Sequence, residues 1–148
     1  MQNSSQSRSA ASAPDFPWAL RVYYEDTDAA GMVYYANYLR FCERARTEWL
    51  RAAGFSQQRM AAEQGLAFVV RSFQAEYRRP AVLDDSLLVL TRIERLGRAS
   101  IEFAQRIVRG DELLFEASVS VACIGTTHHK PTALPAEVRA QLSAHVAA

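Results

Sequence analysis

The chain has 148 residues, of which 49% are hydrophobic, and its formal net charge is +1 at pH 7. This length suits one domain with its own core better than two, and the small charge gives no reason to expect nucleic acid as a partner. No run of about 18 apolar residues occurs, which argues against a membrane span.

The first sixteen residues are rich in Ser, Ala and Gln and carry one charged residue before Asp15, namely Arg8. They lack the apolar segment of a signal peptide, and their Ser-rich, acid-poor composition is only loosely that of a transit peptide. We expect residues 1–16 to form a disordered tail and residues 17–148 to form a single domain.

Hydrophobic periodicity places a strand and a long helix in the first third of the domain. Residues 18–24 alternate weakly like a strand, and residues 26–31 read as a loop from their Asp, Thr and Gly content. Residues 34–53 have the apolar period of a helix, which Gly54 can end. The apolar stripe of this helix consists of Tyr38, Phe41, Cys42, Ala45, Trp49, Ala52 and Ala53.

The remaining two thirds are dominated by strands. A short helix is expected over residues 56–64 and another after Pro135, to about residue 144. Four strand-like segments lie between them, over residues 67–79, 86–96, 100–109 and 113–124. We expect an α+β fold in which these four strands form a meander and one five-stranded antiparallel sheet curves around the long helix.

The only two cysteines are expected to be buried, reduced thiols. Cys42 lies on the apolar stripe of the helix, and Cys123 ends a predicted strand. Two cysteines do not make a disulfide framework, so a reducing, cytoplasmic location fits. A catalytic role for Cys42 would need a thiolate, and nothing near it in the sequence favours one.

Three carboxylates, Glu25, Asp26 and Asp28, crowd the loop before the long helix. Asp26 is most simply a turn residue that bonds its own backbone. Asp28 could be a turn or cap residue too. However, it precedes a glycine and an apolar Met-Val pair, where a carboxylate is unexpected unless it has a specific role. Gly31 suits a left-handed turn and would also let a substrate approach the backbone.

The start of the long helix is the second half of this candidate site. The N–H groups of a first helical turn have no partner within the helix, so they can be capped by water or can polarise a carbonyl oxygen. With Asp28 a few residues away, the pattern predicts a base or nucleophile that acts on a polarised carbonyl group.

Other candidate sites are weaker. His128 and His129 are neighbours whose side chains would point apart on an extended chain, so a solvated loop is favoured over a shared metal. No zinc-type Cys/His spacing, dinucleotide-binding motif or serine-hydrolase motif occurs. Arg95 and Arg98 flank a tight turn, where two side chains could meet one phosphate. We expect neither a metal nor a cofactor.

The segment YYEDTDAAGMVYYANYLRFCERARTEWLR, residues 23–51, resembles the opening of the hotdog-fold acyl-CoA thioesterases. Its nearest branch is the 4-hydroxybenzoyl-CoA thioesterase-like group, in particular the Tol–Pal-associated acyl-CoA thioesterases of bacteria. The later segments AEYRRPAVLDD, LGRASIEF and ASVSVACIGTTHHKPTALP agree, so the resemblance covers about residues 21–135. The Asp-x-x-Gly-x-Val-Tyr-[His/Tyr]-x-Asn-Tyr core is its most specific part.

The resemblance implies a hotdog fold and the hydrolysis of an acyl- or aroyl-CoA thioester. It implies that Asp28 is the catalytic carboxylate, as a nucleophile or as a general base on water, and that the backbone N–H near Tyr35 binds the thioester oxygen. Many such enzymes carry histidine where this chain has Tyr35, so any acid–base role of that histidine is lost here.

The resemblance also suggests where the rest of the substrate lies. Gly31 and Val33, within the same motif, are candidates for contacts to the substrate, and Arg95, Arg98 and Ser100 are candidates for contacts to the coenzyme A phosphates. The family implies a dimer with a continuous sheet and sites at the interface, commonly paired into a tetramer. Acyl carrier protein is a further candidate partner beside acyl-CoA.

Two other functions stay open on the same fold. One is a binding module that senses acyl-CoA or acyl carrier protein without catalysis. The other is a hydratase or dehydratase, although that chemistry usually relies on a histidine base and no histidine lies near the loop. Asp28 argues against both, and thiol release from a panel of acyl-CoA esters would separate the enzyme from the binding module.

Overall fold

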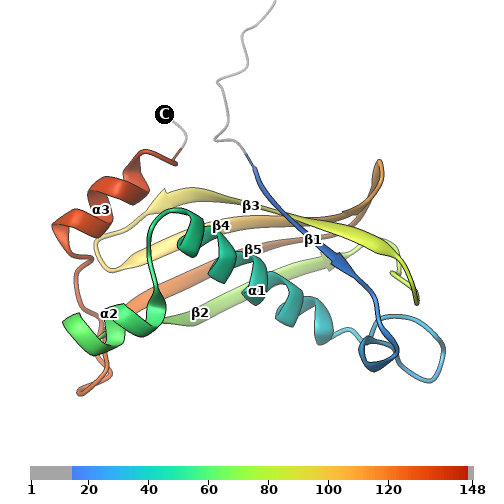
Figure 1. The fold of residues 1–148 in the computed structure, drawn as a ribbon, viewed down its shortest axis with the longest axis horizontal. Helices are drawn as coiled ribbons and strands as arrows, with labels where there is room; N and C mark the ends of the chain where they lie inside the picture. Colours follow the sequence, from blue (N-terminus) through green and yellow to red (C-terminus); the bar gives the residue numbers. More distant parts are fainter. Residues whose placement is uncertain (1–14, 147–148) are drawn as a thin grey trace, which may run out of the picture.

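The computed structural model describes residues 15–146, which form one antiparallel sheet with a long helix lying across one face (Figure 1). The strands are β1 (Phe16–Arg21), β2 (Leu66–Tyr77), β3 (Ser86–Leu96), β4 (Ser100–Arg109) and β5 (Glu112–Gly125). The helices are α1 (Asn37–Ala52), α2 (Gln57–Gln64) and α3 (Ala136–Ser143), with a 3₁₀ turn η1 (Tyr24–Asp26) after β1. The expected α+β fold, with five strands around one long helix, is confirmed.

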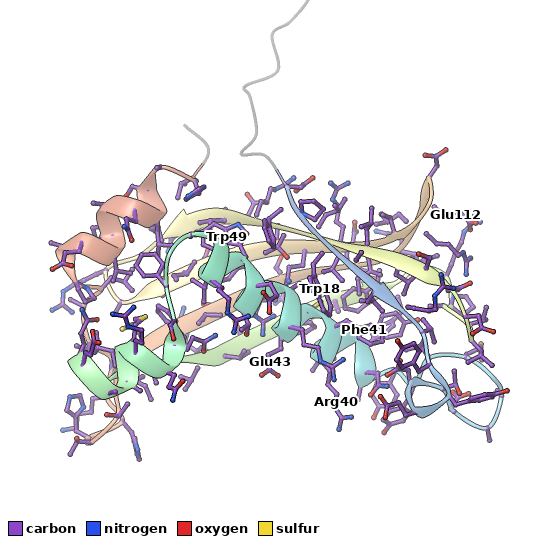
Figure 2. The ribbon with its side chains drawn as sticks, in the orientation of Figure 1. Trp18, Arg40, Phe41, Glu43, Trp49 and Glu112 are labelled. Atoms are coloured by element: carbon purple, nitrogen blue, oxygen red, sulfur yellow. The ribbon has the colours of Figure 1, made fainter. Side chains whose placement is uncertain are left out.

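The apolar stripe of α1 explains why this helix covers the sheet. Its buried members are Tyr38, Phe41, Cys42, Ala45 and Trp49, as the periodicity predicts, whereas Ala52 at the end of the expected stripe is exposed and Ala53 is half-buried. The Trp49 ring meets Phe103 of β4 edge-on, with ring centroids 5.9 Å apart, and the Tyr38 ring stacks on Phe115 of β5 at 5.1 Å. Arg40 and Glu43 project outward from the other side of α1 (Figure 2).

The expected meander of four strands is wrong in one place. The strand order is β1-β3-β4-β5-β2, so β3, β4 and β5 form the meander and β2 pairs with β5 at the far edge. Tight turns join β3 to β4 and β4 to β5, whereas residues 78–85 between β2 and β3 form a longer loop. That loop crosses the ends of β5 and β4, and this connection is what the local strand pattern could not reveal.

Three boundaries near the candidate site also differ from those expected. β1 begins at Phe16, inside the expected tail, while residues 1–14 of that tail lie outside the described residues. β1 ends at Arg21 because residues 24–26 turn into η1. α1 begins at Asn37 rather than at residue 34, because the Asn37 N–H bonds the Tyr34 carbonyl at 2.8 Å in a separate turn.

Both cysteines are buried and free, as expected. Burial raises the pKa of the Cys42 thiol to about 12, so this thiol stays protonated at neutral pH. The structure therefore gives Cys42 a packing role and no catalytic one. Within residues 15–146, none of the helices has both the length and the apolar character needed to cross a membrane.

Candidate active site

Asp28 lies in a small hairpin between η1 and α1. Thr27 and Val33 form a single antiparallel bridge, and the Gly31 N–H closes the turn on the Asp28 carbonyl at 3.0 Å. Gly31 has a φ of +80°, the left-handed conformation that the sequence predicted for it. The hairpin therefore holds Asp28 at a fixed place beside the start of the helix.

The Asp28 carboxylate is oriented by one of its two oxygens. Oδ1 accepts the Ala30 N–H at 2.9 Å and the Met32 N–H at 3.3 Å, as in the turn role considered for this residue. Oδ2 has no hydrogen-bond partner among residues 15–146, and Asp28 is exposed. The turn role and a chemical role are thus compatible, because one oxygen fixes the group and the other is free to react.

Asp26 joins the two ends of this hairpin, which confirms that it is a turn residue. Its Oδ2 accepts the Tyr23 N–H at 2.9 Å, and its Oδ1 accepts a bond from the Asn37 side chain at 3.2 Å. The Asp26 carbonyl also accepts the Tyr34 N–H at 2.9 Å. Asp26 is buried, so its carboxylate ties the loop to the first residue of α1 rather than facing a substrate.

The loop that crosses from β2 to β3 contacts the Asp28 hairpin and supports it. The Ala81 carbonyl accepts the Val33 N–H at 2.9 Å, and the Ala81 N–H donates to the Tyr38 hydroxyl at 3.0 Å. Met32 forms a further bridge to Val82. The position of the Asp28 hairpin therefore depends on a segment about fifty residues further along the chain.

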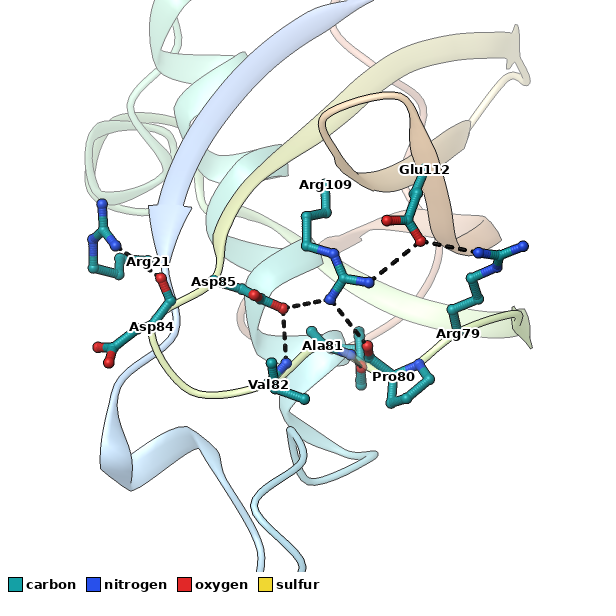
Figure 3. A network of polar contacts seen from close by, with 10 residues as sticks. Arg21, Arg79, Pro80, Ala81, Val82, Asp84, Asp85, Arg109 and Glu112 are labelled. Atoms are coloured by element: carbon teal, nitrogen blue, oxygen red, sulfur yellow. Dashed lines mark hydrogen bonds and ion pairs between the residues drawn. The ribbon is translucent and has the colours of Figure 1, made fainter.

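Ion pairs hold that crossing loop in place (Figure 3). Arg109 of β4 donates to the Asp85 carboxylate at 2.6 Å and to the Pro80 carbonyl at 3.3 Å. The same Asp85 oxygen accepts the Val82 N–H at 2.9 Å. One guanidinium thus clamps both ends of the segment that carries Ala81.

The turn before α1 presents free backbone donors. Among residues 15–146, the N–H groups of Tyr35 and Ala36 have no backbone or side-chain acceptor. The Tyr35 side chain is 64% exposed, and its carbonyl accepts a 2.7 Å hydrogen bond from the Tyr77 hydroxyl of β2. Tyr77 thereby fixes the peptide plane beside these donors, which lie at the positive end of the helix dipole.

The structure does not gather all of the residues predicted from the sequence. Val33 is buried in the core, so in this chain its side chain supports the loop. Arg95 and Arg98 are exposed near the β3–β4 turn, which lies at the opposite end of β3 from the Asp28 hairpin, on the order of 30 Å away (Figure 1). Ser100 begins β4 at the same turn. Within one chain, these three residues and Asp28 cannot contact one small ligand group.

One buried charged residue, Arg46, was not predicted from the sequence. Arg46 lies on the apolar side of α1, one helical turn after Cys42, and is only 7% exposed. The signal was present, because a spacing of four residues puts both side chains on one helix face. Arg46 helps to line a cavity of about 290 Å³ between α1 and the sheet.

Sequence and structure comparisons agree on the family. Residues 22–142 match the Thioesterase-like superfamily. The chain belongs to this superfamily. It is 50% identical to the acyl-CoA thioesterase YbgC of Haemophilus influenzae, over 84% of this chain and 92% of that protein. It is 51% identical to the acyl-CoA thioester hydrolase YbgC of Escherichia coli O6:H1, over 85% of this chain and 94% of that protein.

A solved thioesterase structure supports the fold of this thioesterase-like chain. The crystal structure of a probable thioesterase from Bartonella henselae superposes with a TM-score of 0.78 at 41% identity, covering 82% of this chain and 99% of that one. The resemblance to hotdog thioesterases is therefore confirmed. An oriented carboxylate beside a helix start with free N–H groups can attack, or activate water toward, a carbonyl carbon held at that helix.

Proposed function

We propose that Asp28 and the backbone N–H of Tyr35 carry out the hydrolysis of an acyl- or aroyl-CoA thioester. The enzyme class itself is that of the relatives: the chain is an acyl-CoA thioester hydrolase. The observation that carries the residue assignment is the Asp28 carboxylate, fixed through Oδ1 with Oδ2 free, next to a turn with unpaired N–H donors.

The first step needs a polarised thioester. The Tyr35 N–H, and the neighbouring Ala36 N–H, would bind the thioester oxygen and stabilise the negative charge that develops on it. A single donor of this kind is worth ~3–4 kcal/mol in other enzymes. Because these donors belong to the backbone, the proposed role does not depend on which side chain stands at position 35.

Two routes then lead to the same products. In one, Asp28 Oδ2 attacks the carbonyl carbon, the C–S bond breaks, and water hydrolyses the resulting mixed anhydride. In the other, Asp28 takes a proton from water while the water oxygen attacks the carbon. In both, coenzyme A leaves as a thiolate, which needs little acid help because a thiol has a pKa of about 8.5.

The distance between Asp28 and the β3–β4 turn supports a site shared by two chains. β2 is a twelve-residue edge strand with exposed Val69 and Val70. Antiparallel pairing of β2 with a second β2 would turn the partner end for end, so that its Arg95, Arg98 and Ser100 approach the Asp28 end of the first chain. These residues and Gly31 would then contact the coenzyme A part.

We propose a homo-oligomer on this basis, at least a dimer and preferably a tetramer, that acts in the cytoplasm. The two free, buried cysteines suit a reducing compartment. Acyl carrier protein remains a candidate partner, since it presents the same thioester. Light scattering of an active sample tests the assembly. A mass near 16.5 kDa, that of a single chain, would contradict the shared site.

The competing proposal is a binding module that recognises the thioester without cleaving it. A thiol-release assay with straight-chain and aromatic acyl-CoA esters separates the two. We expect release that grows with enzyme concentration and that differs among the esters. Binding of the same esters without any thiol release would support the module and contradict the proposed chemistry.

A further inference from the structure

The segment that follows β5 folds back along the end of the sheet and reaches the β3–β4 turn. A single bridge joins Pro131 to Ile124 of β5, and another joins Val146, beyond α3, to Ile93 of β3. Between these two anchors α3 lies at the end of the sheet where β3 passes into β4 (Figure 1). The turn of residues 97–99 is therefore in contact with the last described helix.

Two successive carbonyl groups of this turn are held by that segment. Nη2 of Arg139, in α3, donates to the Gly97 carbonyl at 2.5 Å. The Leu134 N–H, just before α3, donates to the Arg98 carbonyl at 2.9 Å. The Gly97 carbonyl is the one acceptor that the Arg139 side chain reaches among residues 15–146. Arg139 thus acts on the backbone of the turn and on no carboxylate of the described chain.

These two bonds also set the direction of the free N–H groups in the turn. Both peptides are trans, so the Gly97 carbonyl and the Arg98 N–H, which share one peptide plane, point in opposite directions. The Arg98 carbonyl and the Ala99 N–H are related in the same way. Among residues 15–146 neither N–H has an acceptor. The turn therefore directs two successive donors away from α3, and such a pair can form a concavity that binds an anion.

Gly97 makes the orientation of its peptide depend on Arg139. A Cβ at this position would lie 2.3 Å from the Ser100 hydroxyl oxygen, so the close approach of Ser100 requires glycine here. The Gly97 N–H is bound to the Ser100 carbonyl at 2.8 Å, but the peptide on the other side of Gly97 has no such local bond. Glycine gives that peptide more rotational freedom than another residue would. The bond from Arg139 is what holds it.

We propose that Arg139 is a positioning residue for the recognition of phosphate by this turn. Its bond to the Gly97 carbonyl keeps the Arg98 N–H directed at a phosphate of coenzyme A, while its own guanidinium stays on the opposite side of the peptide. Without that bond the peptide can rotate and present its carbonyl, an acceptor that repels a phosphate oxygen. This role rests on the proposed function, in which the turn contacts the coenzyme A phosphates.

The test compares coenzyme A with pantetheine, which lacks the phosphates, by calorimetry on the intact protein. Arg139→Met should weaken binding of coenzyme A at least about tenfold, the scale for losing one hydrogen bond to a charged group, and should leave pantetheine binding unchanged. Arg139→Lys should retain most of the affinity, because its ammonium can donate to the same carbonyl. Arg44→Met, exposed on α1, removes the same charge and should bind like the wild type.

A spectroscopic measurement separates positioning from direct contact. In ¹⁵N-labelled wild-type protein, coenzyme A should shift the amide resonances of Arg98 and Ala99. In Arg139→Met the Arg98 resonance should already differ before any ligand is added, whereas resonances of β2 should stay in place. Circular dichroism establishes that the variant is folded, and Arg139→Gln, whose shorter side chain cannot reach the carbonyl, replaces it if it is not.

Arg98→Met separates a failure of this inference from a failure of the proposed phosphate site. If Arg98→Met binds coenzyme A like the wild type, the turn is not the phosphate site and both assignments are wrong. If Arg98→Met weakens binding while folded Arg139→Met does not, only the role of Arg139 is overturned. Equal weakening of coenzyme A and pantetheine by Arg139→Met would also overturn it, because a residue that positions phosphate donors affects only the ligand with phosphates.

Discussion

The Tyr77 hydroxyl donates a 2.7 Å hydrogen bond to the Tyr35 carbonyl, and so links the end of β2 to the turn that starts α1. The Tyr77 ring is held by edge-on contacts with Tyr38 and Phe115, with centroids 5.2 and 5.0 Å away. The core thus fixes the peptide whose neighbouring N–H groups are proposed to bind the thioester oxygen. The edge strand β2 and the turn that starts α1 therefore cannot move independently.

Tyr77→Phe should lower kcat without unfolding the protein. The phenyl ring keeps its contacts, but the Tyr35 carbonyl loses its donor, and a hydrogen bond of this kind contributes about 1 kcal/mol. If that energy is used to orient the turn, kcat falls roughly fivefold. Thiol release and the thermal midpoint check it, and a fall in stability with unchanged kcat would show that the bond does not serve the site.

Tyr35→Phe should keep most of the activity. The variant retains the backbone N–H and the carbonyl that Tyr77 binds, and the side chain is exposed and contacts Tyr34. Steady-state thiol release is the measurement. A loss as large as that in Asp28→Asn would mean that the phenol itself takes part in the reaction.

Asp28→Asn should lower kcat by about 10²–10⁴-fold, the usual scale for the loss of a general base. The amide oxygen can still accept the Ala30 N–H, so the hairpin should keep its shape. Asp111→Asn, in the exposed β4–β5 turn, is the matched control and should behave as the wild type. Near-parental turnover by Asp28→Asn would refute the assignment.

Arg109→Met should lower both the stability of the protein and its kcat. Arg109 holds Asp85 and the Pro80 carbonyl, and its side chain is 29% exposed, so we expect a loss of ~1–3 kcal/mol in the free energy of unfolding. kcat should fall as well, because the crossing loop supports the Asp28 hairpin. Urea unfolding and thiol release measure the two effects.

Arg79→Met is the control for that variant. Arg79 pairs with Glu112 at 3.1 Å, but its side chain is 66% exposed, so the loss should stay below ~1 kcal/mol. If both arginine variants have the same small effect, the Arg109 contacts do not hold the loop as we describe.

The Cys42 thiol should make stability fall at high pH. Its pKa is about 12 in the folded protein against 9.0 as the ordinary value, so above pH 9 the unfolded chain releases this proton first. The stability is therefore complete below about pH 9 and declines as the pH rises toward 12. Urea unfolding at pH 8, 9 and 10 should show a steeper decline in the wild type than in Cys42→Ala. Parallel slopes would mean that the thiol is not as enclosed as the structure has it.

Features that depend on local patterns could be predicted from the sequence alone. The stripe from Tyr38 to Trp49 identified α1 and its buried face, because a helix repeats every 3.6 residues. Glycine and aspartate marked the turn between β4 and β5, and the segment around Asp28 and Gly31 pointed to the candidate catalytic loop and to the family. Each of these features depends on residues close together in the chain.

Which distant segments meet became known only from the folded chain. Alternation shows that β2 has two faces but not that its neighbour is β5, because any strand edge offers the same backbone groups. The contact of Tyr77 with Tyr35 and the support of Val33 by Ala81 follow from that pairing and from the crossing loop. The burial of Arg46 likewise requires the sheet to cover it, so its hydrogen bond to Gln105 of β4 becomes visible only in the folded chain.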